Sequence, residues 1–521
     1  MGTYLIGALT LAFLYIIRRW LEYRGLLRII RDFPGHRTLL KGFSPMLRWR
    51  IPYICPGSDS DIYRKYQDFA ECGHDVMAWV NMFPRARVAY DIADAECLKE
   101  IVNARAHFVK PVYMYRMLSF FGSNLLITEG YEWKRQRKVV APVFSERNNK
   151  LIWDETIRIV GDLFDNVWGN NERVDVDHAV DITLPLALFV LSGAAFGKPV
   201  SWTQGSSVPL GHTMAFKDAL HVVSTQIELK MIFPSWALRW GITLKLRKFQ
   251  QAYEEFSSYM SDMIRERKSD AEKAGGADIL SSLVQANEEE FDGDSKLNQG
   301  ELEGNTFIFL LAGHETTAHS LAFTFGLLAL YPDEQEKYYQ HLKEYLADGR
   351  TPGYEEMGQL TYSLAVLYEA LRMYPTTKRV PKVSTEDTTL STINAGGQKV
   401  VIPVPKGTEL FTSAFGMHYN PRYWPDPDTY KPARFLGDYN RDAFVPFSVG
   451  ARACIGRKFT ETESVAALTM IIMRYKIELK DEPQFAGESF EQKKARLFTV
   501  NSGVTLAPRR LPLVFKRRSL L

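Results

Sequence analysis

The chain has 521 residues, 46% of them hydrophobic and 24% charged, which is ample material for a large buried core. Its 64 basic and 61 acidic residues leave a formal net charge of +3, so the composition provides no global attraction to nucleic acid. The four cysteines form no C-x-x-C pair, which excludes a zinc ribbon or a disulfide framework and fits a reducing compartment such as the cytosol.

The first predicted element is a membrane anchor. Side chains from Gly2 to Ile17 are uncharged and mostly apolar, and Arg18 and Arg19 follow. At ~1.5 Å per residue this run reaches the short end of a spanning helix, and the basic residues behind it place the following chain on the cytoplasmic side. A buried or interfacial helix is the alternative. The expected divisions are an anchor at residues 1–20, a membrane-proximal linker at 21–50 and a single domain at 51–521.

Helical periodicity dominates the remaining sequence, and strand-like alternation is confined to short segments. The first predicted elements are helices over Tyr63–Ala70 and Ala95–Ala104, with a strand over Val88–Ile92 between them. Largely helical sequence follows over Leu151–Gly275, and then a long helix over Asn298–Leu330 and a helix over Glu355–Tyr374. The last elements are strand-like sequence over Thr389–Ile402, a helix over Lys458–Arg474 and strand-like sequence over Phe498–Leu506. This balance predicts a mainly α protein with small β-sheets, in the α+β class.

The most specific signal is the segment around Cys454 (FSVGARACIG). Gly450 permits a turn with positive φ, and Gly456 permits close backbone approach behind the cysteine. The helix predicted from Lys458 places Cys454 near a helix N-terminus, where the dipole and the free N–H groups stabilise a thiolate. A small buried hydrophobe is the alternative interpretation, and it suits the other three cysteines better.

A thiolate in a glycine-containing loop that faces a flat cofactor suits the iron of a heme. Phe447 can shield the sulfur, and Arg452 can pair with a heme propionate. These residues make Cys454 the candidate metal ligand of the segment.

A second motif lies within the long helix, where Ala312-Gly313-His314-Glu315-Thr316-Thr317 interrupts an apolar stretch. Buried polar groups cost free energy unless they are satisfied or functional. The Thr316 hydroxyl can bond the Ala312 carbonyl, and Gly313 weakens the same turn, so the helix can open locally. Ordinary helix packing is the alternative, and we interpret His314 as structural because it faces elsewhere on the helix.

Together the two motifs resemble the F-x-x-G-x-R-x-C-x-G and A-G-x-[DE]-T-[TS] signatures of the cytochrome P-450 family, matched at every fixed position. The resemblance implies a helical heme domain with small β-sheets, with heme b (iron protoporphyrin IX) as cofactor and O2 as co-substrate. It also implies that Cys454 is the axial thiolate and that the catalytic pair is Thr316, which assists oxygen activation, and Glu315, which relays protons.

Three further elements resemble parts of the family's heme scaffold. Glu369 and Arg372 resemble its E-x-x-R pair, and the P-A-R-F segment that contains Arg434 resembles its P-E-R-F element, with alanine in place of glutamate. The resemblance implies a structural network of Glu369, Arg372 and Arg434 that holds the cysteine loop. Trp133 and Arg137 resemble a W-x-x-x-R pair that contacts a heme propionate, for which a solvated basic helix face is the alternative.

Arg379 occupies the position of another propionate partner in the family. The basic residues near these motifs could form a patch for an acidic redox partner. They are Lys134, Arg135, Lys138, Arg457 and Lys458.

The resemblance implies a monooxygenase that is driven by NADPH. Because the sequence contains no credible flavin or nicotinamide domain, the electrons would come from a separate NADPH-dependent flavoprotein reductase, with cytochrome b5 as a second possible donor. We expect a monomer in the endoplasmic reticulum membrane with its folded domain in the cytoplasm. The alternatives are a peroxide-dependent or isomerising heme-thiolate enzyme, which the Glu315-Thr316 pair disfavours, and a non-enzymatic heme-binding protein.

Two apolar, aromatic segments are expected to line the substrate pocket, Phe108–Ile127 and Met214–Ile242. The second could also dip into the bilayer to receive ligand. They suggest a lipophilic substrate, such as a terpenoid or sterol of secondary metabolism, which would be hydroxylated at an unactivated carbon.

Overall fold

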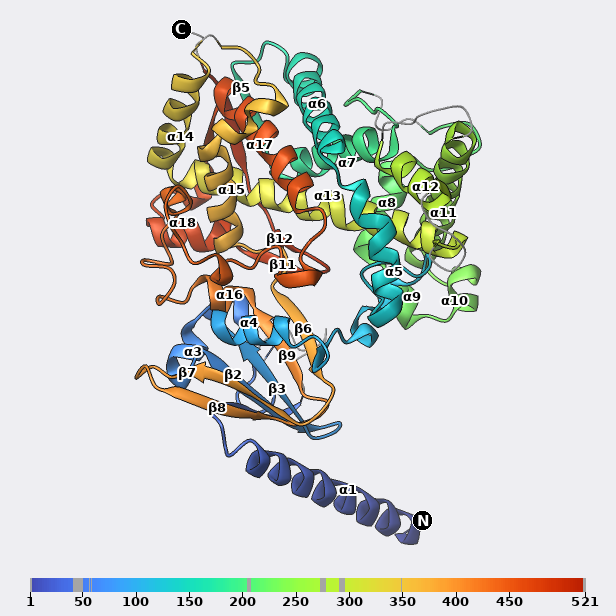
Figure 1. Cartoon of the computed structure of the whole chain (residues 1–521), viewed down its shortest axis with the longest axis vertical. Coiled ribbons are helices and arrows are strands. Elements are labelled where there is room, and N and C mark those ends of the chain that lie inside the picture. The colour runs from blue at the N-terminus through green and yellow to red at the C-terminus, as the bar shows by residue number, and fades with distance from the viewer. Residues whose placement is uncertain are drawn as a thin grey trace. The chain divides into compact units, whose positions relative to one another are not determined.

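The structure is a computed structural model that describes residues 2–40, 50–55, 57, 59–203, 208–271, 278–289, 296–347 and 349–518 (Figure 1). The chain groups into two compact units. Unit 1 consists of Met1–Pro111, Arg372–Thr429 and Asp438–Cys454, and unit 2 consists of Val112–Leu371, Tyr430–Gly437 and Ile455–Leu521.

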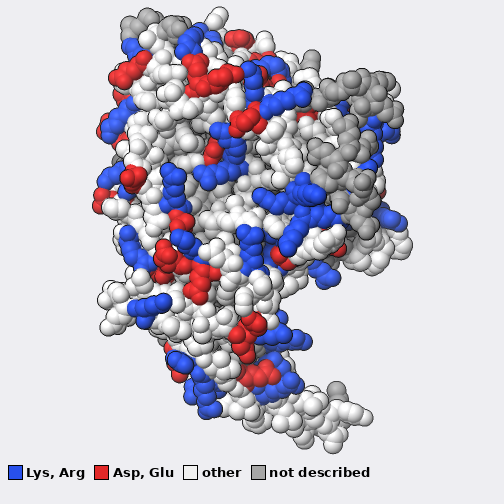
Figure 2. Space-filling model, viewed as in Figure 1, with Lys and Arg blue, Asp and Glu red and all other residues white. Residues whose placement is uncertain are grey.

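Unit 1 begins with helix α1 (Gly2–Ile29), which is longer than the predicted anchor. The chain remains helical for nine residues past position 20, so the first part of the predicted linker is helix, whereas its residues 41–49 lie outside the described part of the chain. The stretch Thr3–Ile29 is long and apolar enough to cross a membrane, and only 6% of its most apolar 18 residues are buried. Figure 2 shows the N-terminal part of this helix without charged side chains.

A six-stranded sheet forms the core of unit 1, in the order β1-β2-β3-β9-β6-β4. Its strands are β1 (Gly35–Leu40), β2 (Val76–Phe83), β3 (Arg87–Ile92), β4 (Phe108–Val109), β6 (Arg379–Ser384) and β9 (Glu409–Ser413). The pairs β1/β2 and β3/β9 are parallel and the others antiparallel. The hairpin β7 (Thr388–Ile393) and β8 (Lys399–Val404) accounts for the strand-like sequence predicted there.

The helices of unit 1 are short. They are α2 (Ser60–Arg64), α3 (Gln67–Cys72), α4 (Ala95–Asn103) and α16 (Ala414–His418). The helix predicted over Tyr63–Ala70 is divided in two, because Lys65 adopts a positive φ of 51° at the end of α2. The start of α4 is fixed by Asp94, whose carboxylate accepts the N–H groups of Glu96 and Cys97.

Unit 2 is mostly helical. Its helices are α5 (Gly130–Val140), α6 (Glu146–Asp162), α7 (Val180–Phe196), α8 (Phe216–Gln226), α9 (Leu229–Ile232), α10 (Ser235–Trp240), α11 (Leu244–Ala271), α12 (Ile279–Glu289), α13 (Gln299–Leu330), α14 (Pro332–Tyr345), α15 (Thr361–Met373, whose last two residues belong to unit 1), α17 (Arg457–Arg474) and α18 (Phe490–Leu497). Two small antiparallel sheets accompany them. Their strands are β10 (Tyr475–Leu479), β13 (Leu513–Arg517) and β5 (Arg173–Val176) in one sheet, and β11 (Val500–Ser502) and β12 (Leu506–Pro508) in the other.

Helix α13 runs through the middle of unit 2 (Figure 1). Asn298 and Glu301 form a capping box at its start, which satisfies two N–H groups that the helix leaves free. It ends at Leu330, and Pro332 begins α14 because proline lacks an N–H and suits the first helical turn. The long helix predicted from Asn298 is thus present, and the mainly α composition with small sheets is confirmed.

Candidate active site

The loop that carries Cys454 belongs to unit 1 and folds back on itself. The Cys454 N–H donates to the Phe447 carbonyl at 2.8 Å, and the Ala453 N–H donates to the Gly450 carbonyl at 3.0 Å. Ser448 and Gly450 both have positive φ, of 56° and 71°. A Cβ on Gly450 would lie 2.1 Å from the Val102 side chain, so glycine is required there for both conformation and space.

Cys454 differs from the other cysteines in its exposure. Its side chain is exposed, Cys55 and Cys97 are buried, and Cys72 is intermediate. Burial raises the pKa of the Cys72 thiol and raises that of Cys97 well above its ordinary value. A metal-ligating thiolate must be accessible, so the folded loop suits Cys454 to this role and no other cysteine.

Gly456 precedes α17 as its N-cap residue, in unit 2. A Cβ added there would meet no atom of the described chain within 4 Å. The expected close backbone approach behind the cysteine is therefore not made by the described protein residues. Gly456 has a φ of −87° and a ψ of 13°, which any residue can adopt, so its conformation does not require glycine either.

Arg372 and His418 hold the start of the cysteine loop within unit 1. The Arg372 guanidinium donates to the His418 carbonyl at 2.9 Å, and the His418 Nε2 accepts the Val445 N–H at 2.9 Å. His418 is fully buried, and burial together with the Arg372 charge lowers its pKa to about 3. The imidazole is therefore neutral and places its other nitrogen, Nδ1, 3.0 Å from the Arg372 carbonyl. No sequence motif distinguishes His418.

Glu369 and Arg434 are paired within unit 2. The Arg434 Nε lies 3.2 Å from the Glu369 Oε1, and the Lys431 N–H donates to the same oxygen at 2.9 Å. The Glu369 side chain is 0% exposed and that of Arg434 is 11% exposed. A buried carboxylate without a counter-charge would cost folding free energy, so the Arg434 charge stabilises the Glu369 carboxylate.

One stripe in the middle of α13 is open although most of the helix around it is buried. Phe309, Ala312, Gly313 and Thr316 retain exposure, while most of their neighbours on the helix are buried. The spacing i, i+3, i+4, i+7 places all four on one helix face. This face can therefore border a space for a cofactor or ligand.

The Thr316 hydroxyl donates to the Ala312 carbonyl at 2.7 Å, as the sequence suggests. The helix nevertheless remains regular α-helix through the motif, so the expected local opening is not present. Gly313 has a packing role instead, because a Cβ there would lie 3.2 Å from the Leu191 side chain of α7. His314 is buried, and its Nδ1 lies 2.6 Å from the Leu310 carbonyl, which fits the structural interpretation.

Trp133 and Arg137 share one face of α5. Trp133 is buried, and the Arg137 guanidinium lies 5.7 Å from the centre of its ring. The pair is therefore preassembled, with the arginine half-exposed, as a propionate contact requires.

Arg379, the first residue of β6, lies in a more acidic environment in unit 1. Its guanidinium pairs with Asp61 at 3.0 Å and with Asp91 at 2.9 Å. A propionate would have to share Arg379 with these two carboxylates. The two aspartates therefore compete with the predicted propionate contact of Arg379.

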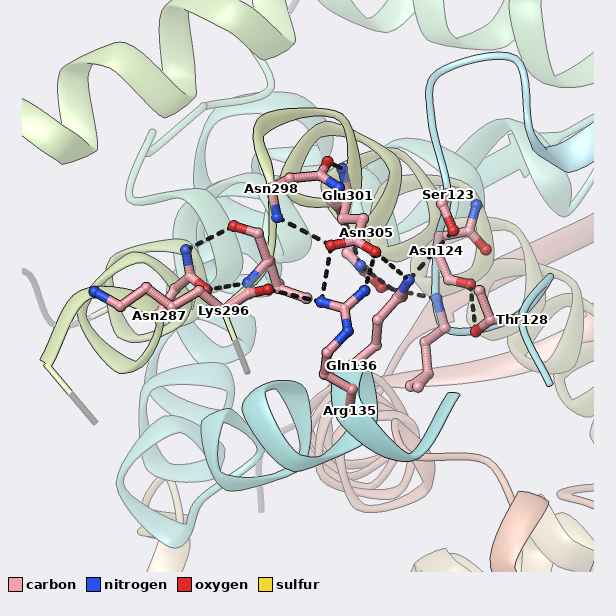
Figure 3. A network of polar contacts seen from close by, with 12 residues as sticks. Ser123, Asn124, Thr128, Arg135, Gln136, Asn287, Lys296, Asn298, Glu301 and Asn305 are labelled. Carbon is pink, nitrogen blue, oxygen red and sulfur yellow. Dashed lines mark hydrogen bonds and ion pairs between the residues drawn. The ribbon is translucent and has the colours of Figure 1, made fainter. Parts of the chain in front are cut away.

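A buried polar network joins α5 to the start of α13 (Figure 3). Arg135 contacts both carboxylate oxygens of Glu301, and its Nη1 donates to the Lys296 carbonyl at 2.6 Å. Gln136 donates to Glu301 at 3.3 Å, and Asn305 donates to Gln136 at 3.1 Å. Burial favours a raised pKa for Glu301, but Arg135 and the N–H of Asn298 outweigh it, so this pKa is lowered.

This network corrects one sequence interpretation. Arg135 is committed to Glu301 inside unit 2 and does not belong to an exposed basic patch. Lys134, Lys138, Arg457 and Lys458 are exposed, although Arg457 pairs with Glu461 at 2.7 Å. Of the five residues in the predicted patch, these four remain able to present charge to a partner.

Replacing Glu301 with glutamine should destabilise unit 2 by about 3 kcal/mol, because the largely buried Arg135 would lose its counter-charge. Hydrogen exchange of the first turn of α13 measures the effect locally. Glu303→Gln is the matched control, since Glu303 lies on the same helix and makes an exposed contact with Gln299. Equal exchange in the two variants would show that the ion pair contributes nothing.

Comparison with known proteins agrees with this site. A family model described as cytochrome P-450 matches residues 53–497. The chain therefore belongs to the cytochrome P-450 family, and it is an enzyme of the monooxygenase type with that family's fold, heme and use of O2.

The relatives include a fungal protein of nearly full-length similarity. Cytochrome P-450 monooxygenase 124 of Postia placenta is 52% identical over 99% of this chain and 100% of its own length. Cytochrome P-450 monooxygenase prx9 of Penicillium rubens is 29% identical over 82% of this chain and 80% of its own length. Cyclooctat-9-en-7-ol 5-monooxygenase of Streptomyces melanosporofaciens is 27% identical over 75% and 80%, respectively.

The residues present fit a heme. Cys454 is an exposed thiol on a loop fixed by hydrogen bonds, and Trp133 with Arg137 is a preassembled contact for an anionic group. Within unit 2, the open stripe of α13 leaves a helix face on which a flat ligand can pack.

Proposed function

We propose that this chain is a membrane-anchored heme-thiolate monooxygenase that inserts one oxygen atom of O2 into a lipophilic substrate. The observation that carries the proposal is the exposure of Cys454 on its rigid, hydrogen-bonded loop, in contrast to the buried or half-buried cysteines elsewhere. When bound, the heme supplies the iron that Cys454 ligates and at which dioxygen is reduced. Phe447, Arg452, Gly450 and Gly456 are assigned to the surroundings of the cofactor.

The chain's own residues bind, orient and supply protons. Thr316 lies on the open stripe of α13. Its hydroxyl, which donates to the Ala312 carbonyl, can instead donate to a bound ligand. Glu315 is adjacent and 8% exposed, so it can pass protons toward that space without opening it to bulk water. Trp133, Arg137 and Arg379 are the proposed propionate contacts, and Glu369, Arg372 and Arg434 the scaffold.

Replacing Thr316 with alanine should retain heme but lower NADPH-driven product formation about tenfold or more, because a hydroxyl that guides protons is lost. The missing product should be matched by hydrogen peroxide, which a peroxide assay measures. Thr306→Ala on the same helix is the control, since the Thr306 hydroxyl is buried and donates to the Leu302 carbonyl at 2.8 Å. A peroxide-driven enzyme would keep full turnover with hydroperoxide and gain none from NADPH and reductase.

The proposed electron source is NADPH through a separate flavoprotein reductase, with cytochrome b5 as a possible second donor. Lys134, Lys138, Arg457 and Lys458 provide exposed positive charge for an acidic partner, although charges of both signs are interspersed on the face shown in Figure 2. A monomer is sufficient for this chemistry, since each proposed cofactor contact comes from the one chain.

The proposed substrate is lipophilic, such as a terpenoid or sterol of secondary metabolism. Phe121 lies in a segment predicted to line the pocket. The centre of its ring lies 4.5 Å from that of Tyr253, on which it stacks, and 4.6 Å from that of Phe307 of α13. This aromatic cluster favours apolar ligands. The streptomycete relative is named for an unsaturated alcohol, which agrees with this class. Spectral shifts with polar, charged compounds alone would contradict it.

The proposed location is the endoplasmic reticulum membrane, with a single pass through α1 and the remaining chain in the cytoplasm. Thr3–Ile29 provides the spanning segment, and Arg18 and Arg19 follow its uncharged part. Exposed Trp236 and Trp240 of α10 suit an additional interfacial contact. The protein should remain in the membrane pellet after alkaline carbonate extraction, and release into the supernatant would contradict an integral anchor.

A further inference from the structure

A series of hydrogen bonds between side chains leads away from Glu315 inside unit 2. The Thr505 Oγ1 lies 3.5 Å from the Glu315 Oε2, and the same Oγ1 lies 2.9 Å from the His319 Nδ1. Glu315 and His319 are one helical turn apart on α13, so they face the same side, and Thr505 bridges them from the turn between β11 and β12.

From this geometry we infer that Thr505 and His319 are proton-relay residues that recharge Glu315 after each transfer toward the active site. The inference rests on the proposed function, which consumes two protons and two electrons for each O2 while one oxygen atom enters the substrate and the other leaves as water. Glu315 alone can deliver only the proton it carries. Repeated turnover therefore needs a route that resupplies protons to Glu315.

The direction of the relay follows from the donor and acceptor capacity of each group. A hydroxyl that donates to the Glu315 carboxylate must accept from the His319 Nδ1–H. Thr505 then gives its proton to Oε2 of Glu315 and takes the Nδ1 proton of His319, while the His319 Nε2 binds a new proton from water. One proton enters at His319 and one arrives at Glu315, and both His319 and Thr505 are left uncharged.

His319 is suited to this relay because it is neutral. It is 9% exposed, and burial, with smaller effects of His314 and His178, lowers its pKa to about 4. A neutral imidazole donates at one nitrogen and accepts at the other, so it can pass protons by changing tautomer.

The groups around His319 define the outer end of the relay. His178 is half-exposed, lies close enough to affect the pKa of His319, and has its own pKa lowered by burial. Asp181 and Arg510 are the charged groups that act on His178. His314 is the other group that acts on the pKa of His319, but its Nδ1 lies against the Leu310 carbonyl, which fits it less well for transfer.

The longest step of the relay is the 3.5 Å between the Thr505 Oγ1 and the Glu315 Oε2, which is at the limit of a hydrogen bond. Catalytic hydrogen bonds are often long in the free protein and shorten when the site is loaded. Thr505 lies in a tight turn, where its carbonyl accepts the Gly503 N–H at 3.2 Å, so a small shift of this turn closes the gap.

The test compares variants that separate a relay from a structural contact. Thr505→Val removes the hydroxyl at nearly constant shape, and Thr505→Ser retains it. His319→Asn keeps a donor at the position of Nδ1 but cannot change tautomer. Thr499→Val, before β11, is the matched control, since the Thr499 hydroxyl donates to the Ala495 carbonyl at 3.1 Å. Each is purified with heme and assayed with reductase and NADPH.

We expect Thr505→Val and His319→Asn to release about tenfold more peroxide per product molecule, with a larger solvent isotope effect on turnover. The expected change is smaller than the ~10²–10⁴-fold loss of a complete acid–base group, because water can slowly recharge Glu315. Thr505→Ser and Thr499→Val should match the unmodified protein. If His319→Asn also matches it, Thr505 and His319 form only a structural contact, and the inference is wrong.

Two further results keep the inference separate from the proposed function. If Glu315→Gln leaves coupling unchanged, the role proposed for Glu315 fails. If Glu315→Gln uncouples while Thr505→Val and His319→Asn do not, only the relay fails. Independently of turnover, ¹⁵N shifts of histidine-labelled protein in the ferrous carbon monoxide form should show His319, assigned by its loss in His319→Asn, as the Nδ1–H tautomer. The Nε2–H tautomer would overturn the relay.

Discussion

Replacing Cys454 with serine should abolish the strongly red-shifted Soret band of the ferrous carbon monoxide complex and reduce monooxygenation to an undetectable level. The red shift depends on a thiolate ligand, and a serine hydroxyl neither ionises readily nor donates comparable electron density. The fold should survive, because the loop is fixed by main-chain bonds to Phe447 and Gly450 and by packing on Val102, which the substitution leaves in place. Circular dichroism and heme content measure this separately from the band.

The control is Cys72→Ser, the most accessible of the remaining described thiols. It should leave the spectrum unchanged. A normal red-shifted band in Cys454→Ser would falsify thiolate ligation by this residue and with it the main proposal.

Replacing Arg372 with methionine should abolish heme incorporation. Arg372 is 0% exposed, donates to the carbonyls of His418 and Thr429, and lies 5.5 Å and 5.7 Å from the rings of Tyr419 and Trp424. Leaving two buried acceptors without a donor costs about 3–5 kcal/mol, a large part of the stability of a domain. The loss is transmitted to the cysteine loop through His418.

Three variants define this prediction. Arg372→Lys should also fail, since an ammonium cannot reproduce the planar fork of a guanidinium. His418→Phe should lower heme content as well, because the Val445 N–H then has no acceptor in its ring. Arg350→Ala, which removes an exposed pair with Glu356, should behave as the unmodified protein. A stable heme-loaded Arg372→Met protein would show that the buried arginine is dispensable.

Local patterns predicted the bounds of α13 and the hydrogen bond within its polar motif. The start of α13 was predictable because Asn298 and Glu301 form a capping box within four residues, and its end because Pro332 follows. The Thr316 bond to Ala312 was predictable for the same reason, since both groups lie within one turn. The positions of these elements are encoded in neighbouring residues.

The remaining features depend on contacts between distant segments. The sheet of unit 1 joins β3 to β9, more than 300 residues apart, and no local pattern specifies that parallel register. Arg135 was assigned to a surface because its partner, Glu301, is 166 residues away. His418 lies in an apolar run without a motif, so only its bond to Val445 reveals it. The acidic environment of Arg379 likewise arises from Asp61 and Asp91 on other elements.

The length of the uncharged part of α1 has a consequence for sorting among organelles. Gly2–Ile17 spans roughly 24 Å at ~1.5 Å per residue, and charged side chains begin at Arg18. This length is close to the hydrocarbon thickness of about 27 Å in the endoplasmic reticulum and well below the value of about 32–33 Å in the plasma membrane. Tyr15, near the end of this stretch, donates to the Pro84 carbonyl at 2.7 Å in the turn between β2 and β3. In the proposed membrane-bound state this contact would oppose movement of α1 deeper into a thicker bilayer, so hydrophobic mismatch would favour thin membranes.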